Sequence, residues 1–303
     1  MNNKLTDVSP TVSQTPFDIP IRKDLRWDFS NVPVDFVKGR SPLIGYFWGA
    51  FSMAAPPVES FFIKALLPTL ETIENDEKLL QDCRDMIKQE AQHSSVHRKL
   101  NQQLEKNGYD VESVTKIYDK VIAKVTEGLT AVDMMGVAAA GEHSLYSFAQ
   151  VWHENPEFND DMHEQAARVF HWHFLEEAEH GAVSHDQYLY FGKNNYWHRL
   201  KMAFRSRHLF FMFDDAVDVI AEGLGYKPTL RDRWDLFYYK WFKPGIFRML
   251  AFRFMEYLSP RYSLTFDHDD IQTMKRWNDN LYASQPPEAR CCLVGMSLVL
   301  LGC

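Results

Sequence analysis

The sequence predicts an all-α protein, and three observations support that prediction. Glycine and proline are sparse, with 14 of each in 303 residues, so long stretches can continue as helix. Apolar side chains recur along these stretches at intervals of three and four residues, which is the spacing of one helix face. Capping residues, glycine and proline separate one stretch from the next. We therefore expect a helical bundle with additional C-terminal helices.

The composition argues against several classes of protein. A formal net charge of -8 and a pI of about 5.8 disfavour a nucleic-acid binder, which normally presents a basic face. The four cysteines form no CxxC pair, so we expect neither a disulfide framework nor a thiolate zinc site: Cys83, Cys291, Cys292 and Cys303. A reducing, cytoplasmic setting fits this cysteine usage.

Targeting and membrane segments are not expected. The N-terminal residues lack the apolar core of a signal peptide. No apolar run reaches the ~18–20 residues of a transmembrane helix. The chain is expected to divide into an extended leader over 1–45, a single helical domain with a C-terminal helical extension over 46–285, and a tail of unassigned role over 286–303.

The helices of this domain can be placed by their end signals. Proline suits a first turn, so the first long helix is expected from Pro56-Pro57 to Asn75. The second starts at the capping pair Asn75-Asp76 and ends at Asn107-Gly108. The others are expected over 113–154 with a break near Gly128 or Gly136, and over 158–191, 197–224 and 230–258. A polar segment follows.

Charged side chains interrupt the apolar stripes of the first four helices. A buried carboxylate without a compensating partner costs several kcal/mol. Such side chains on a core-facing stripe therefore call for a positive charge between the helices. The stripe positions taken by Glu or His are Glu59 in the first helix; Glu90, His93 and His97 in the second; Glu142 in the third; and His173, Glu177 and His180 in the fourth.

The order Glu, Glu-x-x-His, Glu, Glu-x-x-His predicts a dinuclear metal site. Glu59 precedes Glu90 by 31 residues and Glu142 precedes Glu177 by 35, so the halves look like two copies of one helix pair. An i, i+3 pair places carboxylate and imidazole on one helix face. Four-helix bundles with this arrangement hold di-iron or di-manganese centres. Four carboxylates also balance two divalent cations, and these ligands suit iron or manganese.

The expected cofactor is a pair of iron ions, with manganese–iron or other divalent pairs as alternatives. The expected ligands are Glu59, Glu90, His93, Glu142, His173, Glu177 and His180. His97 is expected to be a ligand, an outer hydrogen-bond partner or part of a substrate pocket. Asp133 and Asp186 are candidate partners for the outer nitrogens of ligand histidines. Glu176 and Glu179 should point off the metal face, as outer partners or solvated groups, and His143 should be an outer partner or lie at the surface.

Four of the expected ligands also have an ordinary structural interpretation. Glu59 could be a charge favoured by a helix N-terminal dipole. His93 and His180 could be core histidines satisfied by neighbouring side chains. Glu142 lies among small residues and could be solvated. The pairing of two Glu-x-x-His motifs on separate helices favours the metal site over these alternatives.

Three stretches of the sequence look familiar: 56–63 (PPVESFFI), 90–93 (EAQH) and 172–180 (WHFLEEAEH). They resemble a bacterial family described as a predicted metal-dependent hydrolase, and the resemblance covers about 25–280. The ligand pattern is also similar to di-iron aryl-amine N-oxygenases related to p-aminobenzoate N-oxygenase, which share the additional histidine that is His173 here. The resemblance implies a ferritin-like four-helix bundle with a dinuclear iron site.

Three functions are compatible with such a site. The first is an O2-activating oxidoreductase that acts on a small or apolar organic substrate and draws on an electron donor. The second is a metal-dependent hydrolase in which two ions activate a water. The third is a non-enzymatic bundle that stores or senses metal. A homodimer is compatible with each of these functions.

The later part of the chain is rich in aromatic residues. We expect the residues Phe204, Leu209, Phe210, Phe211 and Phe213, together with those from Phe237 to Phe242, to pack against the bundle. The alternative is that they form a hydrophobic substrate tunnel or a surface that faces a membrane.

Overall fold

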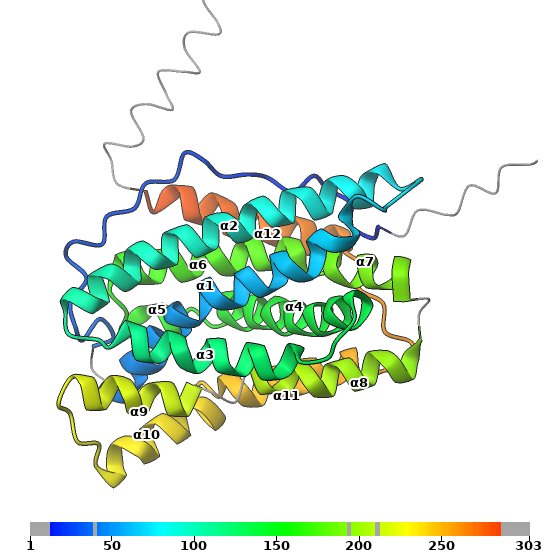
Figure 1. Cartoon of the computed structure of the whole chain (residues 1–303). Coiled ribbons are helices and arrows are strands. Elements are labelled where there is room, and N and C mark those ends of the chain that lie inside the picture. Colours follow the sequence, from blue (N-terminus) through cyan, green and yellow to red (C-terminus); the bar gives the residue numbers. More distant parts are fainter. Residues whose placement is uncertain (1–12, 39–40, 193–194, 210–212, 286–303) are drawn as a thin grey trace, which may run out of the picture.

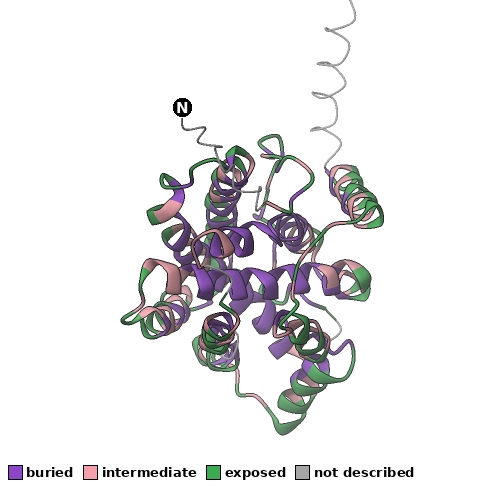
Figure 2. Ribbon diagram, turned by 90° about the vertical axis from the view of Figure 1, so that its right-hand side faces the viewer, coloured by how far each residue is buried: buried purple, intermediate pink, exposed green. Residues whose placement is uncertain are grey.

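The computed structural model describes residues 13–38, 41–192, 195–209 and 213–285. These residues form an all-α protein, and among them the one strand-like pairing is a bridge between Val37 and Met162. Four long helices form the centre: α1 (Pro42–Leu70), α2 (Glu77–Lys106), α4 (Ala131–Glu154) and α6 (Glu164–His180). Figure 2 shows the buried residues gathered at the centre of the bundle, with partly exposed helices around them.

The remaining helices pack around this centre (Figure 1). α3 packs against α1, α7 against α2 and α4, α8 and α11 against α4, α9 and α10 against α1, and α12 against α6. Their bounds are α3 Val111–Thr126, α5 Glu157–Asp160, α7 Val183–Gly192, α8 Tyr196–Ser206, the 3-10 helix η1 Arg207–Leu209, α9 Phe213–Gly223, α10 Leu230–Trp241, α11 Ile246–Tyr257 and α12 His268–Ala283.

The first helix starts earlier than the prolines suggested. α1 begins at Pro42 and continues through Pro56 and Pro57, so the expected start at those residues is wrong. A proline inside a helix costs about 3 kcal/mol or more. Every residue from 43 to 55 is buried, and each large apolar side chain contributes roughly 1.5–3 kcal/mol on burial. Burial of this run therefore outweighs Pro56 and Pro57, and α1 also contains a third interior proline, Pro68.

Several expected helix ends are confirmed by their caps. The Asp76 side chain accepts a hydrogen bond from the Leu79 backbone N–H at 3.0 Å and starts α2. The break in the third expected helix falls at Gly128, whose φ of 69° suits glycine. Thr130 and Asp133 then form a reciprocal capping box for α4.

The later helices differ in detail from the expected ones. The helix expected over 158–191 is three helices, α5, α6 and α7, and a further helix, α12, lies in the polar segment for which no helix bounds were expected. In α12 only Met274 and Leu281 are buried, so its sequence shows little apolar periodicity. Its start is marked instead by a capping box between Asp267 and Asp270.

The described part of the leader lies against the bundle, where Figure 1 shows it crossing the upper side. The side chains of Ile19, Leu25 and Phe36 are buried there. Arg22 is buried as well, although its neighbour Lys23 is exposed. Packing of this segment therefore delivers a charged side chain to the interior.

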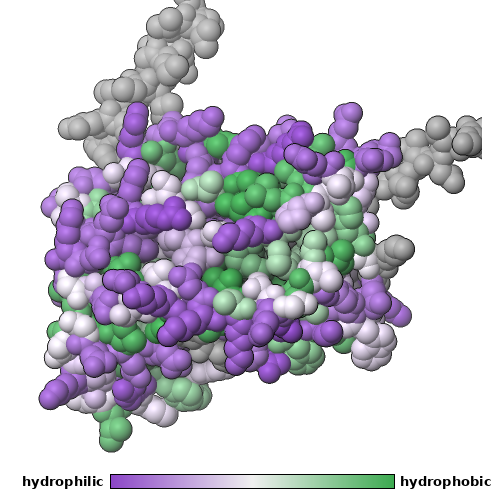
Figure 3. Space-filling model, in the orientation of Figure 1, coloured by the Kyte–Doolittle hydropathy of each residue, from purple (hydrophilic) through white to green (hydrophobic). Residues whose placement is uncertain are grey.

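One helix of the described part, α1, is long and apolar enough to cross a membrane by length and composition. In its most apolar window, 67% of the residues are buried inside the molecule. Apolar surface over α1 is visible between the more hydrophilic α2 and α3 (Figure 3). α1 also contributes the buried Glu59, and this burial fits the core helix of a bundle.

Candidate metal centre

Four helices bring the seven expected ligands together in the middle of the bundle. α1 contributes Glu59, α4 contributes Glu142, and α2 and α6 contribute the two Glu-x-x-His motifs together with His173. All seven side chains are buried, none with more than 1% of its surface exposed. The structure therefore places every expected ligand at one location.

The seven residues form two groups that could each hold a cation. Glu59, His93, His173 and Glu177 make the first group, and Glu90, Glu142, Glu177 and His180 make the second. Within each group the candidate ligand atoms all lie within 4.8 Å of one another. Glu177 belongs to both groups, so its two carboxylate oxygens are placed to bridge two ions.

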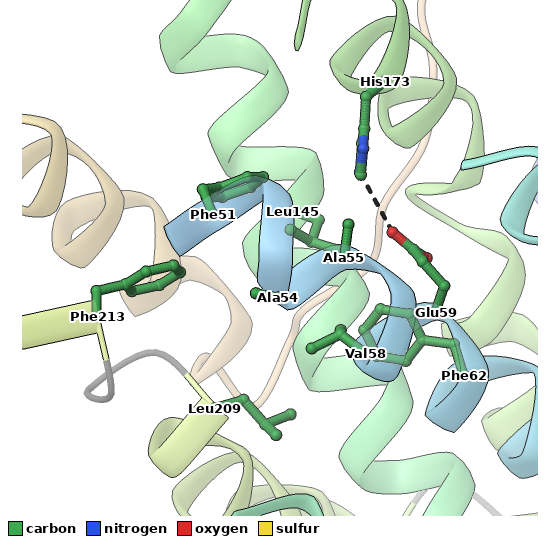
Figure 4. A pocket seen from close by; sticks show the side chains of 10 residues that line it. All are labelled: Phe51, Ala54, Ala55, Val58, Glu59, Phe62, Leu145, His173, Leu209 and Phe213. Atoms are coloured by element: carbon green, nitrogen blue, oxygen red, sulfur yellow. Dashed lines mark ion pairs between the residues drawn. The ribbon is translucent and has the colours of Figure 1, made fainter. Parts of the chain in front are cut away.

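Distances within the groups show how closely the side chains converge. His173 Nε2 lies 3.0 Å from Glu177 Oε1 and 3.4 Å from Glu59 Oε1. In the second group, His180 Nδ1 lies 3.0 Å from Glu90 Oε1 and 3.9 Å from Glu142 Oε2. Figure 4 shows the Glu59 and His173 side chains directed at each other across the bundle.

The unsatisfied polar atoms at this location test whether a metal fits. Both oxygens of Glu90, Glu142 and Glu177 are buried without a hydrogen-bond partner, and so is Oε2 of Glu59. The inward nitrogens of the three histidines also lack one. Each unmet buried polar atom costs about 1–3 kcal/mol. Two divalent cations would satisfy all of these atoms and balance four carboxylates, so the residues fit a dinuclear metal site.

Outer hydrogen bonds fix the protonation of two ligand histidines. His93 Nε2 lies 3.0 Å from Glu176 Oε2, and His180 Nε2 lies 2.6 Å from Gln89 Oε1. The Gln89 amide is oriented by its own N–H donations to Glu179 and to the Pro20 carbonyl. Both outer partners are acceptors, so the proton of the neutral imidazole sits on Nε2 and the bare Nδ1 faces the centre.

A longer chain of hydrogen bonds determines which ring nitrogen of His173 carries the proton. The Ser52 hydroxyl donates to Asn101 Oδ1 at 2.7 Å, so Ser52 Oγ accepts from His97 Nδ1–H at 2.9 Å. His97 Nε2 is then bare and accepts from His173 Nδ1–H at 2.7 Å. This leaves His173 Nε2 free to bind a cation. His97 therefore takes the outer-partner role among those expected for it.

Arg22 anchors the outer layer, by which we mean the side chains that hydrogen-bond to the candidate ligands or to the partners of those ligands. Its guanidinium donates to Glu176 Oε1 at 2.9 Å and to both oxygens of Glu179, at 2.5 and 3.0 Å. Burial alone would lower the pKa of Arg22, but these two carboxylates outweigh it and raise that pKa. Glu176 and Glu179 are both buried, so the solvated alternative for them is wrong and the outer-partner role holds.

Three other residues considered as outer partners of the candidate ligands lie away from the metal centre. Asp133 accepts a hydrogen bond from His198 Nε2 at 2.6 Å and caps α4, and Asp186 accepts from the Gln14 backbone N–H at 2.7 Å. The structure does not place either carboxylate at a ligand histidine. His143 is buried beside Tyr262, its Nδ1 2.9 Å from the hydroxyl, so the surface alternative for it is wrong.

Sequence reasoning missed Arg22, Ser52, Gln89 and Asn101 as parts of this layer. Ser52 and Asn101 occupy core-facing positions of α1 and α2, and Gln89 directly precedes Glu90, so buried polar residues beside the ligands were the available signal. Arg22 had no local signal, because it contacts residues more than 150 positions away in the sequence.

Metal binding should release protons. Burial would lower the pKa of His180, but the nearby carboxylates of Glu90 and Glu177 outweigh it and raise that pKa to about 9. The pKa of His93 is raised well above its usual value in the same way, with Glu176 the largest contributor after burial. Protons and cations compete for these nitrogens.

At pH 7 we expect at least two protons per chain to leave when metal binds. For each proton displaced, the apparent metal affinity should fall about tenfold for every unit by which the pH is lowered. For the proton on His180 this decrease should begin below a pH of about 9. Calorimetric titration in buffers of different ionisation enthalpy measures the number released. Release of no protons at pH 7 would contradict the arrangement of His93 and His180.

A narrow apolar cavity reaches the first ligand group. Its volume is about 30 Å³, room for about one or two water-sized molecules. Figure 4 shows its lining, in which the aromatic and aliphatic side chains of α1 and α4 face Phe213 and Leu209. Among the described residues that line it, the polar ones are Glu59 and His173, which face the centre. The cavity therefore joins the candidate metal centre to an apolar environment.

Comparison with known proteins supports the metal site. No match to the chain was found among curated proteins or among solved structures. The model of a family described as "Predicted metal-dependent hydrolase" matches residues 21–263, which cover most of the chain and all seven candidate ligands. The chain therefore belongs to this family of predicted metal-dependent hydrolases.

Proposed function

We propose that the protein binds two iron ions and uses O2 to oxidise a small, apolar organic substrate. The observation that supports this most is the apolar cavity that ends on Glu59 and His173. The four central helices and their ligand order fit the ferritin-like bundle expected from the sequence.

The surroundings of the centre favour oxidation over hydrolysis. A hydrolase must bind a polar bond and protonate a leaving group, which requires donors beside the metals. The described cavity lining is apolar apart from two residues that face the centre. Such a lining admits a small diatomic molecule such as O2, and it excludes bulk water from a reactive centre.

The chain's residues would have distinct roles in this function. Bound iron would supply the redox chemistry. Glu177 would bridge the two ions, and the three histidines would each present a bare nitrogen, oriented by Glu176, Gln89 and His97. Phe51 and Leu145 would line the route by which an apolar substrate approaches Glu59, and the side chains around the cavity would have to move apart to admit it.

The oxidation requires a source of electrons. Insertion of one atom of O2 into a substrate C–H bond, with release of the other as water, consumes two electrons and two protons beyond those of the substrate. The proposal therefore includes an external electron donor, such as a small redox protein.

The second candidate is a metal-dependent hydrolase, which the description of the family favours. In that function the two ions would activate a water, and turnover would not require O2. The third candidate, metal storage, would require uptake beyond two ions per chain.

Oxygen consumption by the iron-loaded, chemically reduced protein tests the proposal. We expect rapid consumption by the iron-loaded protein and none by the zinc-loaded protein. We also expect Ala54→Leu, which narrows the cavity, to slow the reaction at unchanged metal content, whereas Ala91→Leu on the exposed side of α2 leaves it unchanged. No reaction of the reduced iron form with O2 would contradict the proposal, and hydrolysis of ester substrates by the zinc form would favour the hydrolase.

A further inference from the structure

Large exposed apolar side chains are concentrated on three helices. Of the twelve such residues in the described part of the chain, ten lie between Trp197 and Met255, on or next to α8, α10 and α11. These helices lie along the same edge of the bundle, the lower one in Figure 1. A set of this size is more than the scattered apolar side chains that any soluble protein exposes. We call this surface the α8–α10–α11 face.

α10 shows the pattern most clearly, because its exposed side is the apolar one. Leu230, Trp234, Phe237, Tyr238 and Trp241 are spaced as one helix stripe and are all exposed, with Leu230 at 89%. Apolar side chains project at the lower edge of Figure 3, where Figure 1 places α10. The core packing expected for 237–242 is therefore wrong for most of these residues, and it is also wrong for Phe204. Leu209 and Phe213 are buried as expected, and Phe210 and Phe211 lie outside the described residues.

α8 and α11 present mixed stripes of apolar and basic residues. On α8, Trp197 and Phe204 are 76% and 56% exposed, with the exposed Lys201 between them. On α11, Phe252 and Met255 are exposed beside the exposed Arg248. Tryptophan and phenylalanine alternating with Lys and Arg are typical of helices that lie in the interface of an anionic membrane.

The charge of this part of the chain is opposite to that of the whole. Residues 196–262 contain twelve Lys or Arg and seven Asp or Glu, a formal net charge of +5, whereas the full chain carries -8. Arg199 and Lys240 of this range are buried and α9 lies outside the face, but the charged side chains of α8, α10 and α11 that are not buried still give a formal net charge of +3: Lys201, Arg205, Arg231, Arg233, Arg248 and Arg253 against Asp232, Asp235 and Glu256. The face therefore suits a negatively charged partner. It suits a second copy of itself less well, because two faces of like charge would repel each other.

An apolar hollow opens in the same face. Its volume is about 210 Å³, and its lining includes Trp241, Phe247, Leu250 and Phe254, with Ser144 on α4. The next residue along α4, Leu145, lines the cavity at the candidate metal centre. The hollow and that cavity therefore reach two neighbouring residues of α4.

We propose that the α8–α10–α11 face docks on the surface of an anionic lipid bilayer. The aromatic side chains would enter the boundary between head groups and acyl chains, and Lys201, Arg231 and Arg248 would contact the lipid phosphates. The hollow would open toward the acyl chains. Docking itself depends on this face alone and is independent of metal binding and of the proposed oxidation.

Co-sedimentation of the full-length protein with lipid vesicles tests the proposal. We expect binding to vesicles of phosphatidylcholine mixed with phosphatidylglycerol, at least tenfold weaker binding to phosphatidylcholine alone, and weakening by added salt. The variant W197S/W234S/F252S should lose most of the binding. L67S, which alters an exposed apolar residue on α1, should bind like the natural protein.

A charge variant separates the electrostatic contribution to vesicle binding from the contribution of the apolar side chains. K201E/R231E/R248E should lose binding to the anionic vesicles, whereas R98E/K99E on the exposed side of α2 should retain it. Equal binding of the natural protein and W197S/W234S/F252S would overturn the proposal. A change of the natural protein from dimer to monomer in that variant, without vesicle binding by either, would assign the face to a second copy instead.

Discussion

Replacing Glu177 by alanine should remove both metal ions, whereas replacing Glu59 or Glu142 should remove mainly one. Glu177 belongs to both ligand groups, and the other two glutamates belong to one group each. Metal analysis of the purified variants after reconstitution with ferrous iron measures this difference. We expect close to zero ions per chain for Glu177→Ala, about one for Glu59→Ala and about one for Glu142→Ala.

The control for this comparison lies on the same helix. Glu164 is exposed in the first turn of α6, and Glu164→Ala should keep both ions. Retention of one tightly bound ion by Glu177→Ala would mean that the two groups are independent and that Glu177 does not bridge them.

Replacing Arg22 by methionine should strongly destabilise the protein and weaken metal binding. Arg22 compensates the charges of Glu176 and Glu179, both of which are buried. Removal of one partner of a buried ion pair typically costs about 3–5 kcal/mol. The same change should weaken metal affinity by roughly 10–100-fold, because Glu176 orients His93.

Urea unfolding and metal titration measure the two effects of Arg22→Met. Lys23→Met is the matched control, because Lys23 is adjacent and exposed. The double variant R22M/E179Q should recover part of the stability, since it removes one of the unpaired charges. Equal stability of Arg22→Met and Lys23→Met would contradict the role of Arg22 as the anchor of the outer layer.

The clustering of the candidate ligands could be predicted from the sequence because each of them interrupts a local pattern. Glu90 and His93 stand on an apolar stripe of α2, and Glu177 and His180 repeat that arrangement on α6, so periodicity alone places them in the interior. The start of α2 at Asp76 and the break near Gly128 before α4 were also predictable, because their signals lie within a few residues of the helix ends.

Features that depend on distant contacts could not be predicted in this way. The early start of α1 results from burial of residues 43–55 against the rest of the bundle, which overrides the local effect of Pro56 and Pro57. Arg22 lies in a segment without periodicity, and its role appears only when 13–38 packs across α6. The exposed stripe of α10 reads in the sequence as a core stripe, because periodicity does not tell which side of a helix faces solvent.

Location of the bound ions tests the central claim most directly. Anomalous diffraction at the iron edge, from crystals of the reconstituted full-length protein, would show each iron as a separate peak. We predict two peaks: one among Glu59, His93, His173 and Glu177, and one among Glu90, Glu142, Glu177 and His180. A single peak, or none between α1, α2, α4 and α6, would contradict a dinuclear iron centre in this protein.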